Sequence, residues 1–175
     1  LAARVCLKLM LVGAGAAKSA VACRVAKNEK GQPVALCEED GRLYRYPCSL
    51  SHKGAYVLAA AALKPGCLIG ADVEKVDPRI MRLRRRFEQA EDRIGLEPRD
   101  KTYYTVLWSL KEAASKALGG GLFDMLGGLV CRKEGAWLYC RRAGSGQGPE
   151  LRLTYRLHDG YAVSLAGTAP ISPAA

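Results

Sequence analysis

The clearest hydrophobic pattern in the chain lies in its second half, over residues 102–118. Apolar residues at positions 106, 107, 110, 113, 114 and 117 recur every three or four residues, which is the spacing of the inward face of a helix. Gly119–Gly121 follow directly, and glycine is common just past the end of a helix. The pattern therefore predicts a long amphipathic helix over Thr102–Leu118.

Short apolar segments separated by turn residues follow this helix and are typical of strands. They are Leu129–Cys131, Ala136–Cys140, Leu151–Leu157 and Tyr161–Ala166. A second amphipathic helix is expected earlier, over Arg79–Arg93, because Ile80, Leu83 and Phe87 recur at helical spacing among many arginines. The second half is thus expected to be helical first and then an antiparallel meander.

The first part of the chain has a weaker pattern. Residues 1–17 fit either a strand or a helix, Lys18–Lys27 has helix-like spacing, and Asn28–Pro33 is rich in turn residues. A polar turn is expected at 48–54, before an apolar run at 55–61 that periodicity does not assign to a strand or a helix. Cys67–Glu74 predicts a strand that ends in acidic residues.

We place the boundary between two halves at Pro65-Gly66, which gives an N-terminal half of residues 1–66 and a C-terminal half of residues 67–175. The halves share a faint repeat, since His52–Ala59 resembles His158–Leu165. Duplication of one unit and chance similarity both explain it. The first half is short, and its natural length is left open because the chain starts at Leu1 and not at Met.

Composition limits the class of protein. With 175 residues, 49% hydrophobic and 25% charged, the chain is expected to fold as one globular domain or as two small halves that share an interface. Its 27 Lys and Arg against 17 Asp and Glu give a net charge of +10. This surplus predicts an anionic partner: nucleic acid, an acidic protein, a phosphorylated cofactor or an anionic membrane surface.

Cysteine spacing and hydropathy predict the compartment. The seven cysteines include no C-x-x-C pair and no neighbouring His, so we expect reduced thiols in a cytoplasmic protein and not a zinc site or a disulfide framework. The apolar stretch Leu7–Ala17 contains Lys8 and is followed by Lys18. It is shorter than the roughly 20 apolar residues that a membrane-spanning helix needs, and we expect neither a membrane span nor export.

Three acidic residues are candidates for a metal site. Asp72 and Glu74 are two residues apart, so on a strand their carboxylates leave the same face, although acidic residues at a strand end are often simply solvated. Glu112 and Lys116 share one face of the long helix, where a surface ion pair is the alternative. If Glu112 meets Asp72 and Glu74, their mutual repulsion is relieved by a divalent cation such as Mg²⁺.

A magnesium ion held by three carboxylates keeps coordination positions for phosphate oxygens, so the expected ligand carries a diphosphate. Ser51, His52 and Lys116 would supply hydrogen-bond donors and positive charge for it. His52 taken alone is more often a structural or surface histidine.

Two segments resemble the signatures of the 4′-phosphopantetheinyl transferases, in the family's order: Ile69–Glu74 (IGADVE) and Trp108–Gly119 (WSLKEAASKALG). Ser49–His52 is similar to the family's third motif, and Phe87–Glu91 resembles its acidic segment between the signatures. Because the Ser-His motif precedes the acidic one, the chain is similar to the monomeric, two-half surfactin-synthetase-activator type.

The resemblance implies an α+β fold of the phosphopantetheinyl transferase kind. Two similar α/β halves would form a pseudo-dimer, each with an antiparallel sheet packed on a long helix, and the site would lie between them. Members transfer the 4′-phosphopantetheine group of coenzyme A to a serine hydroxyl of an acyl or peptidyl carrier protein and release adenosine 3′,5′-bisphosphate.

The resemblance also implies a role for each site residue. Asp72, Glu74 and Glu112 would bind Mg²⁺, and Ser51, His52, Lys116 and Lys18 would contact coenzyme A. Glu91, Glu112 and Lys116 would be catalytic, with Glu91 or a metal-bound water as the base. Gln32 departs from the family, which often has a basic residue there.

The expected partners are coenzyme A and an apo carrier protein whose pathway the sequence does not specify. The arginine-rich segment 79–93 would dock an acidic carrier by charge complementarity. The alternative is a basic nucleic-acid-binding module that uses the same segment. No groove-reading or stacking motif supports it, because aromatic residues are only 7% of the chain and are dispersed, so we expect no nucleic acid and no membrane as partners.

Overall fold

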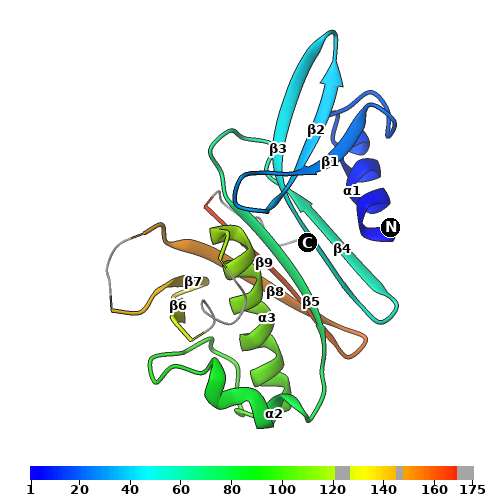
Figure 1. The fold of residues 1–175 in the computed structure, drawn as a ribbon. Helices are drawn as coiled ribbons and strands as arrows, with labels where there is room; N and C mark the ends of the chain where they lie inside the picture. The colour runs from blue at the N-terminus through cyan, green and yellow to red at the C-terminus, as the bar shows by residue number, and fades with distance from the viewer. Residues whose placement is uncertain (121–126, 145–147, 169–175) are drawn as a thin grey trace.

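The chain forms two antiparallel sheets with helices, which is an α+β fold (Figure 1). The computed structural model describes residues 1–120, 127–144 and 148–168. Gly121, part of the glycine-rich stretch 144–149 and the end of the chain lie outside the described residues. Within the described residues no helix has both the length and the apolarity to cross a membrane.

The first sheet has the strand order β1-β2-β3-β4 and is preceded by one helix. Its elements are α1 (Ala2–Gly13), β1 (Cys23–Lys27), β2 (Pro33–Glu39), β3 (Arg42–Lys53) and β4 (Tyr56–Ala61). Helix α1 buries Leu7 and Leu11 against this sheet, together with Cys23, Cys37 and Cys48. These small and aliphatic side chains give the first sheet a core of its own.

The second sheet has the order β5-β9-β8-β7-β6. Its strands are β5 (Ile69–Lys75), β6 (Leu129–Glu134), β7 (Trp137–Arg142), β8 (Leu151–His158) and β9 (Tyr161–Gly167). Between β5 and β6 lie α2 (Ile80–Leu83), the short 3₁₀ helix η1 (Arg84–Arg86) and α3 (Lys101–Leu118). Figure 1 shows α3 lying along the sheet, where it forms the main core of the molecule.

Both ends of α3 are fixed by local chemistry. The Asp100 carboxylate accepts hydrogen bonds from the backbone N–H groups of Thr102 (2.8 Å) and Tyr103 (3.1 Å), which is a side-chain N-cap. At the other end Gly119 adopts a left-handed conformation with φ of 72°. The helix predicted over 102–118 is confirmed, as is the meander of the last four strands.

The two sheets meet where β3 lies alongside β5. The Ser49 hydroxyl accepts a hydrogen bond from the Ala71 N–H (2.9 Å), and the Ser51 hydroxyl accepts one from the Val73 N–H (3.3 Å). The β3–β4 hairpin also reaches the β8–β9 hairpin, because the Tyr56 hydroxyl donates to Asp159 at 2.9 Å. These two hairpins carry the faint repeat found in the sequence.

Two expectations about local structure in the first half were wrong. Lys18–Lys27 is not helical, since Cys23–Lys27 is strand β1 and pairs with β2. Ser49–Lys53 continues strand β3 and the chain turns only at Gly54, whose φ is 57°. The apolar run that was left open between strand and helix is strand β4.

The helix expected over Arg79–Arg93 was also wrong, because only α2 and η1 are helical there. Side chains bind the backbone that a continuing helix would use. The Lys111 ammonium donates to the carbonyl oxygen of Phe87 (2.6 Å), and the Asp92 carboxylate accepts from the N–H of Gln89 (2.7 Å). The buried Phe87 marks the point where the chain leaves the helix.

Candidate metal and phosphate site

Strand β5 and helix α3 approach each other unusually closely at Gly70. A Cβ atom added there would lie 1.8 Å from the carbonyl oxygen of Ala113 and 2.8 Å from the nitrogen of Ala117. Only glycine leaves room for this contact. The contact places Asp72, two residues further along β5, beside Glu112 on α3.

The structure brings together the three carboxylates that the sequence suggested. One oxygen each from Asp72, Glu74 and Glu112 lies within 4.8 Å of the others. Asp72 is 1% exposed and Glu112 is 8% exposed, so two of the three groups are shielded from water. We call these residues the acidic trio.

Two lysines form ion pairs with the acidic trio in the structure. The Lys116 ammonium lies 2.6 Å from Asp72 Oδ1 and 3.5 Å from Glu112 Oε2. The Lys53 ammonium lies 2.8 Å from Glu74 Oε2. Lys53 follows the Ser-His motif on β3, so the first sheet supplies one of the two counter-charges.

Ser51 belongs to the same cluster. Its hydroxyl lies 2.9 Å from Asp72 Oδ1 and donates to it, and it accepts from the Lys116 ammonium at 3.3 Å. Lys116 also donates to the Ala71 carbonyl oxygen at 3.3 Å. The polar contacts therefore join β3, β5 and α3 at one point.

The environment changes the proton affinity of Glu112. Burial raises the pKa of its carboxyl, and the neighbouring Asp72 raises it further, to about 8, although Lys116 opposes the change. At neutral pH this side chain is mainly protonated in the absence of a further cation. A divalent cation between the three carboxylates would favour the ionised form.

A buried carboxylate oxygen of Asp72 also supports a divalent cation as the ligand of this site. Among the described residues Asp72 Oδ2 is buried and has no hydrogen-bond partner. An orphaned carboxylate oxygen is costly unless something binds it. Hard oxygen ligands clustered in this way suit Mg²⁺ or a similar divalent cation, so the acidic trio fits the ion that the sequence suggested.

Cavities flank the acidic trio. One, of about 520 Å³, is lined by Lys53, Glu74, Trp108 and Tyr161 among others. Another, of about 210 Å³, is lined by Lys30, Gln32, Lys116 and Gly119 among others. An extended ligand that lies across the carboxylates would have space on both sides.

Gln32 is a site residue whose role the sequence analysis missed. Its side-chain amide donates to the carbonyl oxygens of Lys116 (2.9 Å) and Ala117 (3.2 Å) at the C-terminal end of α3. The sequence marked it only as a departure from a basic residue. Its position in a Gly-Gln-Pro turn carries no signal that the side chain caps a distant helix.

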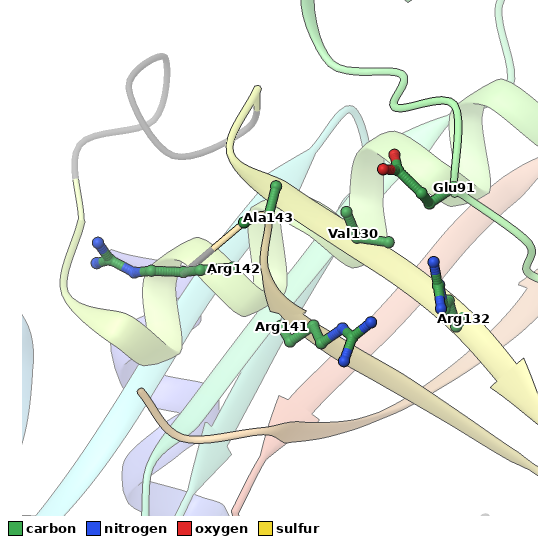
Figure 2. A pocket seen from close by; sticks show the side chains of 7 residues that line it. Glu91, Val130, Arg132, Arg141, Arg142 and Ala143 are labelled. Atoms are coloured by element: carbon green, nitrogen blue, oxygen red, sulfur yellow. The ribbon is translucent and has the colours of Figure 1, made fainter. Parts of the chain in front are cut away.

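Glu91 does not join the acidic trio. It is exposed and lines a separate cavity of about 230 Å³ with Arg132, Arg141 and Arg142. Figure 2 shows its carboxylate beside strand β6, with Arg132 nearby. The structure thus places the candidate base in an arginine-rich setting on the second sheet.

His52 and Lys18 also lie apart from the acidic trio. His52 is exposed, and the alternation of side chains along β3 directs it away from the face that carries Ser51. Lys18 is exposed and forms an ion pair with Asp40. Of the residues expected to contact coenzyme A, the structure brings Ser51 and Lys116 to the carboxylates.

The comparisons agree with the motifs. The family model of the 4′-phosphopantetheinyl transferase superfamily matches residues 68–166. The chain is 29% identical over 126 residues to the 4′-phosphopantetheinyl transferase psf-1 of Bacillus pumilus, covering 70% of this chain and 53% of that protein. It is 28% identical over 129 residues to the 4′-phosphopantetheinyl transferase Sfp of Bacillus subtilis, covering 71% and 56%. The chain spans just over half the length of these curated relatives.

Proposed function

The chain belongs to the 4′-phosphopantetheinyl transferase superfamily, and we propose that it transfers the 4′-phosphopantetheine group of coenzyme A to a serine hydroxyl of an apo acyl or peptidyl carrier protein. The reaction would depend on Mg²⁺ and release adenosine 3′,5′-bisphosphate. The observation that carries the proposal is the convergence of Asp72, Glu74 and Glu112 within the matched region.

Asp72, Glu74 and Glu112 would hold the magnesium ion. When bound, the ion neutralises the diphosphate of coenzyme A and makes its phosphorus more open to attack. The burial of Asp72 and Glu112 strengthens electrostatic interactions there because little water screens them.

Lys116 and Lys53 would bind the phosphate oxygens. Each ammonium now lies against a carboxylate of the acidic trio, so both are already placed at the point where the diphosphate would come. Ser51 would orient Asp72 through its hydrogen bond. As the bond from phosphorus to the leaving adenosine 3′,5′-bisphosphate breaks, these positive charges would stabilise the negative charge that develops.

The flanking cavities suggest how coenzyme A would lie. The smaller cavity, beside Lys30 and Lys116, would receive the phosphate-bearing nucleotide, since both lysines face it. The larger cavity, with Trp108 and Ile80 in its wall, would receive the pantetheine arm. His52 and Lys18 remain proposed contacts for the outer phosphate.

The acceptor serine must lose its proton during the reaction. We propose Glu91 as the base, with a water molecule as the alternative, because Glu91 lies in the segment that resembles the acidic motif of the family. A Glu91→Gln variant decides between the two bases, since only direct proton transfer to Glu91 makes turnover depend on it.

The exposed arginines of η1 would attract an acidic carrier protein. We also propose that the protein acts as a monomer of two similar halves.

Mass spectrometry of the carrier tests the proposed function. Incubation with coenzyme A, Mg²⁺ and an apo carrier protein should add one phosphopantetheine to the carrier. The Asp72→Ala and Glu112→Ala variants should lose this activity because the metal is lost, and Glu38→Gln, on the first sheet, should retain it. A carrier whose mass is unchanged by the wild-type protein, or is changed by the Asp72→Ala variant as fast as by wild type, would reject the proposal.

A further inference from the structure

A buried ion pair joins α3 to the segment 87–94 without taking part in the acidic trio. The Lys111 ammonium is 2.6 Å from Asp92 Oδ2, and both side chains are fully shielded from solvent. Lys111 directly precedes Glu112, so their side chains leave the helix about 100° apart. Helix α3 thus presents Glu112 toward β5 and Lys111 toward the segment 87–94.

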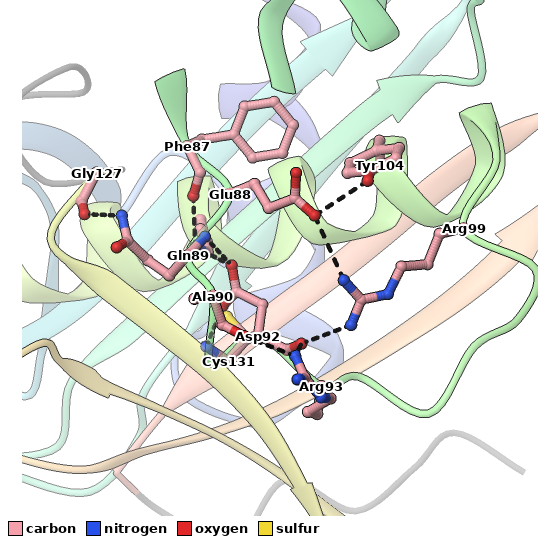
Figure 3. Close-up of polar contacts among 11 residues, drawn as sticks. Phe87, Glu88, Gln89, Ala90, Asp92, Arg93, Arg99, Tyr104, Gly127 and Cys131 are labelled. Carbon is pink, nitrogen blue, oxygen red and sulfur yellow. Dashed lines mark hydrogen bonds and ion pairs between the residues drawn. The ribbon is translucent and has the colours of Figure 1, made fainter. Parts of the chain in front are cut away.

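The Asp92 carboxylate connects three parts of the fold. It accepts hydrogen bonds from the N–H of Gln89 (2.7 Å) in its own segment and from the N–H of Cys131 (2.8 Å) on β6 (Figure 3). It also accepts one from the Lys111 ammonium on α3. Lys111 in turn donates to the Phe87 carbonyl oxygen (2.6 Å). The pair therefore fixes both ends of the stretch from Phe87 to Asp92.

This stretch has no helix to hold its shape. It follows η1, and its next residue, Arg93, pairs with β6 through backbone bonds to Cys131 (2.8 Å) and Lys133 (2.6 Å). Glu88 accepts from the Tyr104 hydroxyl at 3.0 Å, while Glu91, next to Asp92, is directed outward into the arginine-lined cavity. Glu88 therefore has a side-chain contact of its own, whereas Glu91 directly precedes the Asp92 carboxylate that the ion pair fixes.

Stabilisation of the fold does not by itself explain why Asp92 and Lys111 form a buried ion pair. Removing two charges from water costs several kcal/mol per ion, and neutral side chains of similar size often serve a core equally well. A charged pair with directional bonds to α3, β6 and the segment itself, however, restricts how the segment can be placed. An ion pair of this kind is suited to fixing the backbone of the segment 87–94.

We propose that Asp92 and Lys111 are positioning residues, whose buried ion pair holds the segment 87–94, with Glu91, in the place that group transfer requires relative to Glu112. This inference rests on the proposed function. It assigns to Lys111 and Asp92 no contact with coenzyme A, metal or carrier.

The test is a double variant, Asp92→Asn/Lys111→Met. It removes both charges of the ion pair, so no unpaired charge is left in the core. The amide oxygen of the introduced asparagine can still accept from Cys131, so the fold should persist. We expect kcat for carrier modification to fall about 10- to 100-fold, the cost of a displacement of about 1 Å. The KM for coenzyme A and the affinity for Mg²⁺ alone should stay within about twofold of wild type. Backbone amides of 88–93 should exchange hydrogen faster.

The matched control is Glu38→Gln/Arg45→Met, which removes the same two charges from exposed positions of the first sheet and should leave every readout unchanged. A wild-type kcat in the double variant would overturn the inference, whether or not its backbone amides exchange faster. The single Asp92→Asn variant gives a second test, since it too should expose the segment to exchange. Wild-type protein that binds Mg²⁺ yet modifies no carrier would instead reject the proposed function, and faster exchange in the variants would still be measurable.

Discussion

At Glu112, burial and the nearby negative charge of Asp72 both raise the pKa of the carboxyl group. Its carboxyl is shielded by α3 and β5 and faces Asp72, so the pKa is raised from 4.5 to about 8. The neighbouring Glu74 raises this pKa further, and only the positive charge of Lys116 opposes the change. The side chain is therefore poised to give up a proton when a cation binds.

Proton release on metal binding should be measurable at pH 7. Because the pKa of Glu112 is about 8 in the metal-free protein, most molecules carry its proton and should release it when Mg²⁺ binds. Titration calorimetry in buffers of different ionisation enthalpy should show release of nearly one proton at pH 7 and far less at pH 9. The Glu112→Gln variant should show none, and a binding heat that is the same in every buffer would contradict the assignment.

The same raised pKa sets the pH dependence of stability. Below pH 4.5 Glu112 is protonated in both the folded and unfolded states; between 4.5 and about 8 the unfolded chain loses the proton first. Folding stability of the metal-free protein should therefore fall as pH rises through this window, and the loss should be complete above pH 8. The comparison of wild type with Glu112→Gln by chemical unfolding isolates this contribution. Equal slopes in the two proteins would contradict it.

Residue spacing predicted the acidic trio but not its surroundings. The two-residue interval of Asp72 and Glu74 and the four-residue interval of Glu112 and Lys116 each define one face of an element. Lys53 and Gln32 belong to the first sheet, and only its apposition brings Lys53 to Glu74 on β5 and Gln32 to the end of α3. Local periodicity carries no information about such contacts.

At the scale of elements, the site depends on how closely β5 lies against α3. In the Gly70→Ala variant the new methyl group would overlap the Ala113 carbonyl oxygen, which is backbone and cannot move aside by a change of rotamer. We expect a loss of about 3 kcal/mol in the free energy of unfolding, and weaker Mg²⁺ binding because Glu112 moves away from Asp72.

The control for this prediction is Gly13→Ala, at the end of α1. No atom lies within 4 Å of a Cβ added at Gly13. That variant should be as stable as wild type or slightly more so, since alanine favours the helix. Chemical unfolding of both variants, followed by circular dichroism, gives the comparison. A Gly70→Ala protein with wild-type stability would show that α3 and β5 are not packed as described.

Elements with a strong period and clear end signals were predictable. The helix α3 has six inward apolar positions and a terminal glycine, and the last strands are bounded by turn residues. Arg79–Arg93 also has helical spacing, but side chains from Lys111 and Asp92 bind its backbone, and tertiary contacts outweigh local propensity there. The N-cap at Asp100 was not predicted, although Asp before a helix is a known signal.

At the scale of the whole molecule, the site belongs to both sheets. The second sheet and α3 supply the carboxylates, while the first supplies Ser51, Lys53 and Gln32. The hydrophobic pattern predicted an antiparallel meander in the second half, and the family resemblance implied an antiparallel sheet in each half. The sequence did not predict that the β3–β4 and β8–β9 hairpins contact each other through Tyr56 and Asp159. A contact between two turns produces no periodic pattern of hydrophobic residues in the sequence.

We propose that Asp72, Glu74 and Glu112 bind one divalent cation that also binds the diphosphate of coenzyme A. Anomalous diffraction from crystals grown with Mn²⁺ and coenzyme A locates the cation. We expect a single strong anomalous peak at coordination distance from all three carboxylates and from the diphosphate. A peak elsewhere, or a diphosphate bound away from these residues, would contradict it.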